Sequence, residues 1–121
     1  MAETDSGTKD YRQAAGGVTL VYSTFPSLDA ARTLARSLIE RRLVACVNII
    51  PGMTALYAWE GVLHEDTEVV AIFKTQSGHV AEVMTAVRAG HPYANPAVLA
   101  LDAAASSRPY LDWVMSQTQR P

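Results

Sequence analysis

The fold is decided by the stretch Val44-Ala45-Cys46-Val47-Asn48-Ile49-Ile50, which reads as a β-strand because it is rich in apolar and β-branched residues. A strand with one face in water alternates apolar and polar residues, whereas this one is apolar on both phases. The same holds for residues 69–73 (VVAIF) and 98–101 (VLAL). The sheet built from these strands therefore needs cover on both faces.

Upstream of this stretch the sequence predicts a strand followed by a helix. Residues 18–25 are rich in β-branched and aromatic side chains, which favours a strand. Apolar residues then recur at helical spacing from Leu28 to Ile39, and Ser27 just before them is a suitable N-cap. Arg41 and Arg42 suit the negative C-terminal end of this helix.

Downstream, turn residues divide the chain. Pro51-Gly52 bends it, Glu60-Gly61 allows a tight hairpin turn, and Ser77 is a second candidate cap. The expected elements are strands at 44–50 (continued at 53–59), 62–75 and 97–101, a helix at 78–89, and a short helix within 106–117.

The order of these elements is β-α-β-β-α-β, which predicts the α+β class. We expect a ferredoxin-like βαββαβ antiparallel sheet with both helices on one face, because both crossovers should be right-handed, plus a short C-terminal helix. Residues 1–16 are polar and small and read as a disordered N-terminal tail, which leaves 17–121 as a single domain. Since the helices cover only one face, we expect an obligate homo-oligomer with sheets packed face to face and hairpin edges paired across subunits.

Composition narrows the class of protein. The 121 residues are 49% hydrophobic and 18% charged with a net charge of -2, which argues against a nucleic-acid partner. The single cysteine, Cys46, forms no intramolecular disulfide. Residues 43–59 carry no charge but contain Asn48 and Pro51-Gly52, so they are no membrane-spanning helix. Without a signal peptide at the N-terminus, we expect a cytoplasmic protein that does not contact membranes.

Motifs of catalysis are absent from the sequence. It contains no GxxxxGK[ST], GxGxxG, HExxH, paired CxxC or GxSxG. The three histidines, at 64, 79 and 91, fall on different expected elements. No acid/base or nucleophile–base pair is apparent, so we expect that the protein is not an enzyme.

Five residues remain open to two interpretations each. Cys46 is either a small buried hydrophobe or a soft ligand or redox thiol. His91, in a stiff segment before Pro, either hydrogen-bonds a backbone group or takes part in binding. Lys74 either extends to solvent or holds a charge at a cleft rim to meet an anion. Tyr57 and Trp59 share one strand face and form either an interface or a ligand platform.

Several segments together resemble the CutA family, the divalent-cation tolerance proteins. The similar segments are Tyr22-Ser-Thr-Phe-Pro-Ser27, Leu43-Val-Ala-Cys-Val-Asn-Ile-Ile-Pro-Gly52, Tyr57-Ala-Trp-Glu-Gly61, Phe73-Lys-Thr75, His91-Pro-Tyr93 with Pro96, and Tyr110-Leu-Asp-Trp113. The resemblance implies a ferredoxin-like homotrimer, similar to PII signalling proteins in architecture, with a role in tolerance of divalent metals such as copper. It also implies that Cys46, Trp59, Lys74, His91 and Tyr93 gather near clefts between subunits.

The chain departs from the family pattern where metal ligands would be expected. Ala94 and Ala97 stand where members often carry Glu, and Ser23 and Gly90 where some bacterial members have Cys and a second His. The resemblance therefore leaves His91 as the main candidate ligand. A weak or absent metal site is the expectation.

Two functions follow from these patterns. The first is a non-enzymatic trimer of copper or other divalent-cation tolerance, with weak metal binding through His91 at inter-subunit clefts. The alternative is a PII-like signalling trimer that binds a small anionic ligand in the cleft. The cleft residues for either function are Trp59, Lys74, Tyr93 and Cys46.

Overall fold

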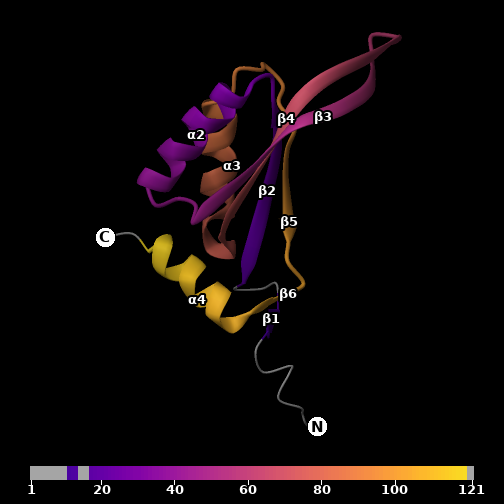
Figure 1. The fold of residues 1–121 in the computed structure, drawn as a ribbon. Helices are drawn as coiled ribbons and strands as arrows, with labels where there is room; N and C mark the ends of the chain where they lie inside the picture. The colour runs from indigo at the N-terminus through magenta and orange to yellow at the C-terminus, as the bar shows by residue number, and fades with distance from the viewer. Residues whose placement is uncertain (1–10, 14–16, 120–121) are drawn as a thin grey trace.

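The computed structural model describes residues 11–13 and 17–119. Its centre is a four-stranded antiparallel sheet with strand order β3-β4-β2-β5, and two helices cover one face (Figure 1). The elements are β1 (Tyr11–Gln13), β2 (Val18–Phe25), α2 (Leu28–Glu40), β3 (Cys46–Trp59), β4 (Val62–Gln76), a 3₁₀ turn η1 (Ser77–His79), α3 (Val80–Ala89), β5 (Val98–Asp102), β6 (Ala105–Ser107) and α4 (Arg108–Gln117). This arrangement confirms the predicted α+β, ferredoxin-like class.

Helix α2 has a side-chain cap at its N-terminus but none at its C-terminus. Ser27 accepts a hydrogen bond from the Ala30 N–H at 3.1 Å, as an N-cap does. The helix ends at Glu40, and Arg42 follows with a left-handed backbone (φ 58°). The Arg42 guanidinium then donates to the carbonyl oxygens of Gln119 (2.7 Å) and Ser116 (2.8 Å), so it caps the end of α4 and not that of its own helix.

The β3–β4 hairpin has close to the predicted bounds and extends beyond the body as an arm (Figure 1). Strand β3 runs without interruption through Pro51-Gly52, where a bulge between Ile50 and Met53 absorbs the bend. The turn at Glu60 and Gly61 has positive φ at both residues (51° and 77°), which is the type I′ geometry that matches the twist of a hairpin.

Three local predictions need correction. Ser77 does not cap α3: it opens the 3₁₀ turn, and its hydroxyl lies 3.0 Å from the Gly17 carbonyl oxygen. Strand β6 was not predicted, and it pairs antiparallel with β1. Strand β1 falls within the segment expected to be a disordered tail, whereas 1–10 and 14–16 lie outside the described residues.

The core lies between the helices and the sheet. Every second residue of β2 points into it, and Val21 and Phe25 are fully buried against Phe73 of β4 and the stripes of α2 and α3. The largest buried side chains of this layer are Phe25, Phe73, Leu38, Leu43, Val83 and Val87.

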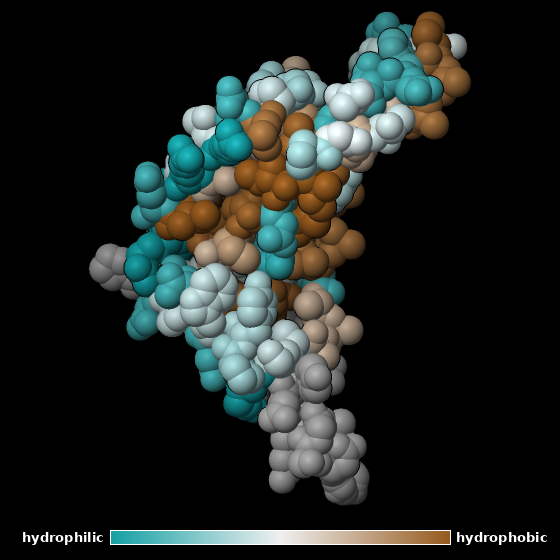
Figure 2. All heavy atoms as spheres, viewed as in Figure 1, coloured by the Kyte–Doolittle hydropathy of each residue, from teal (hydrophilic) through white to brown (hydrophobic). Residues whose placement is uncertain are grey.

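The opposite face of the sheet is apolar and carries no helix. The register places Leu20 between Leu101 and Lys74, and Tyr22 between Leu99 and Ile72, on the side away from the core. Ile50, Leu99 and Leu101 are 51%, 55% and 52% exposed. Apolar residues also gather at the tip of the arm, where Leu56, Val62 and Leu63 are exposed (Figure 2). We call the sheet surface of Leu20, Tyr22, Ile50, Ile72, Leu99 and Leu101 the open face.

Candidate functional site

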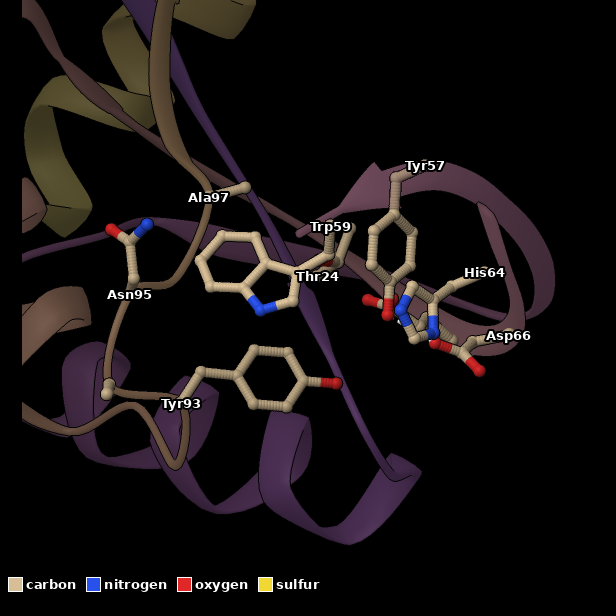
Figure 3. A pocket seen from close by; sticks show the side chains of 10 residues that line it. Thr24, Tyr57, Trp59, His64, Asp66, Tyr93, Asn95 and Ala97 are labelled. Atoms are coloured by element: carbon tan, nitrogen blue, oxygen red, sulfur yellow. Dashed lines mark hydrogen bonds between the residues drawn. The ribbon is translucent and has the colours of Figure 1, made fainter. Parts of the chain in front are cut away.

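A hollow of about 640 Å³ lies between the arm and the segment 93–97 (Figure 3). Strand β3 supplies Tyr57 and Trp59, and the 93–97 segment supplies Tyr93. The other lining residues are Thr24 of β2, His64, Asp66 and Glu68 of β4, and Ala94, Asn95 and Ala97. We call this hollow the arm pocket.

The hairpin register explains why these side chains meet. Tyr57 and Trp59 are two residues apart and share one face, and His64 pairs with Tyr57 across the hairpin. The Tyr57 and His64 rings stack with centroids 5.2 Å apart and an interplanar angle of 13°. The Tyr57 hydroxyl donates to Asp66 Oδ2 at 2.5 Å. The prediction that Tyr57 and Trp59 share a face is therefore confirmed.

The arm pocket is electrically negative. Asp66 and Glu68 line it, and none of its described lining residues is Lys or Arg. The hydrogen bond to Asp66, followed by burial, raises the pKa of Tyr57 above its ordinary value. Burial raises the pKa of Tyr93, and the carboxylates of Glu68 and Asp66 add to the effect. Such a surface attracts cations and repels anions.

His91 contacts Tyr93 but is not among the residues that line the arm pocket. Its Nε2 donates to the Thr24 carbonyl oxygen at 2.7 Å, and its Nδ1 accepts from the Tyr93 N–H at 3.1 Å. The ring also stacks on Phe25, with centroids 4.3 Å apart. Burial lowers the pKa of His91, and the Thr24 carbonyl offsets part of that effect, so the neutral ring fits its surroundings.

This arrangement opposes the prediction that His91 is a metal ligand. A neutral imidazole coordinates through the lone pair of one nitrogen, and here the Nδ1 lone pair accepts the Tyr93 N–H while Nε2 carries the donated proton. Within this chain His91 instead positions Tyr93, whose ring lies 5.0 Å from its own.

Cys46 and Lys74 lie at the other end of the hairpin. Cys46 and Lys74 are cross-strand partners. Cys46 begins β3 and Trp59 ends it, so roughly 40 Å of strand separates Cys46 from Trp59. Cys46 Sγ lies 3.5 Å from the Tyr110 hydroxyl, and Lys74 Nζ lies 5.8 Å from the centroid of the Tyr110 ring. Burial, with a contribution from Cys46, raises the pKa of Tyr110 to about 12. The four predicted cleft residues thus form two groups within one chain.

The two positions where some family members carry further metal ligands, Ser23 and Gly90, have surroundings without a metal site in the described part of this chain. Ser23 is buried with its Oγ unpartnered among the described residues, and a Cβ at Gly90 would lie 2.7 Å from Leu34 Cδ1. Across residues 11–13 and 17–119, no group of three or more His, Cys, Asp or Glu side chains is placed to hold a metal ion. A divalent cation therefore finds no complete ligand set in a single described chain.

Sequence reasoning missed the acidic side of the arm pocket. The polar first half of the strand at 62–75 carries His64, Asp66 and Glu68, to which no role was assigned. Their alternation at every second position was a usable signal. A two-residue turn at 60–61 places Tyr57 opposite His64, so the register follows from the turn itself.

Comparison with known proteins gives concordant matches. Residues 19–117 match the family model of the CutA1 divalent ion tolerance protein. The divalent-cation tolerance protein CutA of Thermus thermophilus is 43% identical over 99 residues, which cover 82% of this chain and 96% of that protein. Human Protein CutA is 41% identical over 104 residues, which cover 86% of this chain but 58% of the human protein.

Solved structures show the same similarity in three dimensions. CutA1 from Ehrlichia chaffeensis superposes with a TM-score of 0.84 at 31% identity, over 87% of this chain and 98% of that one. The Thermus thermophilus protein gives a TM-score of 0.79 at 42% identity, over 84% and 99% of the two chains.

No helix among the described residues is long and apolar enough to span a bilayer.

Proposed function

The chain belongs to the CutA1 divalent ion tolerance protein family, and from this premise we propose that it acts in divalent-cation tolerance as a non-enzymatic homotrimer. The observation that carries the proposal is the open face. A soluble monomer rarely exposes an apolar sheet surface of this kind. Packing this surface between copies of the chain removes it from water.

Three features support assembly through the open face. Ile50, Leu99 and Leu101 of this face are about half exposed in the single chain, and fully burying one such side chain is worth about 1.5–3 kcal/mol. Strands β3 and β5 are the two edges of the sheet and are available for pairing. The arm extends beyond the body (Figure 1), and its tip carries the exposed apolar residues Leu56, Val62 and Leu63, which a neighbouring copy would cover. We take the number three from the resemblance to CutA proteins.

Divalent cations, copper among them, then bind weakly and between copies. Within one chain the His91 nitrogens are both hydrogen-bonded, and Cys46 lies far along β3 from the arm pocket. The carboxylates of Asp66 and Glu68 raise the local concentration of cations without a complete ligand set.

The alternative of a small anionic ligand finds less support. Of its predicted residues, Trp59 and Tyr93 line an acidic pocket, whereas Lys74 lies beside Cys46 and Tyr110. An enzyme built from Cys46, Lys74 and His91 is not favoured either, because His91 is engaged with Thr24 and Tyr93.

Sedimentation equilibrium tests the proposal. We expect three copies for the wild type, and dissociation for the double variant Leu99→Glu/Leu101→Glu, which places charge on the open face. The control is Ile39→Glu, which changes an aliphatic residue that is 42% exposed on the helix side, and this variant should remain trimeric. A wild-type protein that stays monomeric at micromolar concentration contradicts the proposal.

The cytoplasm remains our prediction for the compartment. Relatives carry other assignments in their names: the Archaeoglobus fulgidus CutA is described as periplasmic and the Arabidopsis thaliana protein as chloroplastic. Fractionation of the source cells, with the protein detected by antibody, decides between these compartments.

A further inference from the structure

We draw no further inference here: the strongest candidate, the groove between α2 and α3 on the helix side of the sheet, where Leu34, Ser37, Ala89 and Gly90 border two hollows of about 540 and 410 Å³, carries nothing because no feature of the structure shows what covers it.

Discussion

His91 Nε2 donates a hydrogen bond to the carbonyl oxygen of Thr24 at 2.7 Å, joining the segment after α3 to the end of β2. The same ring accepts the Tyr93 N–H through Nδ1 and stacks on Phe25 of the core. Both ring nitrogens and one ring face thus have structural partners, and these contacts place Tyr93 in the wall of the arm pocket.

Replacing His91 should destabilise the fold without changing copper binding. His91→Ala removes two hydrogen bonds worth about 1 kcal/mol each and an aromatic contact worth about 1 kcal/mol, so we expect a loss of about 2–4 kcal/mol. Urea unfolding measures the loss. Copper isotherms of wild type and His91→Ala should superimpose, with Cys46→Ser as a second comparison. A weaker isotherm for His91→Ala alone would restore its role as a ligand.

The same ring makes stability dependent on pH. Because burial lowers the pKa of His91 in the folded state, the unfolded chain binds the proton more readily. Its contribution to stability is complete above the unfolded pKa of about 6.5 and is lost as the pH falls through the lowered folded pKa. We expect the Tm of the wild type to fall between about pH 7 and pH 5 more steeply than that of His91→Gln. Parallel Tm curves would show that His91 is not responsible.

The sequence predicted the main sheet and helices because their patterns are local. The β-branched and aromatic composition of β2, the helical stripe of α2 and the turn at Glu60 and Gly61 each depend on nearby residues. The two apolar phases of the other strands predicted the open face. Strand β6 escaped notice because Ala105–Ser107 is short and polar, and its partner β1 is more than 90 residues away.

The candidate site was predicted only in part, because its residues come from segments that are far apart in the sequence. Trp59 and Tyr93 do line one pocket, but the contact between the arm and the 93–97 segment is a tertiary one that no periodicity encodes. The engagement of His91 with Thr24 likewise joins residues 67 positions apart. Ser77 failed as a cap because its hydroxyl contacts Thr19 and Gly17, which lie far upstream.

The arm turn should respond to substitution in opposite directions at its two positions. Gly61 has φ 77° and Glu60 has φ 51°, a conformation that Gly and Asn adopt more readily than other residues. Gly61→Ala should lower stability by about 1 kcal/mol, whereas Glu60→Asn should raise it by a few tenths of a kcal/mol up to about 1 kcal/mol. Differential scanning calorimetry measures both. A Tm of Gly61→Ala equal to the wild type contradicts the type I′ assignment.

Arg42 should stabilise the C-terminal helix α4 through its two hydrogen bonds, and not α2 through the interaction of its charge with the helix dipole. Its guanidinium donates to two carbonyl oxygens at the end of α4, and its backbone is left-handed. Arg42→Gly relieves the backbone strain but removes both bonds, so we expect a net loss of about 1–2 kcal/mol and faster hydrogen exchange in α4. Arg41→Gly, at the neighbouring exposed position, is the control and should leave exchange in α4 unchanged. Equal protection of α4 in Arg42→Gly and wild type would show that the two bonds do not hold the helix.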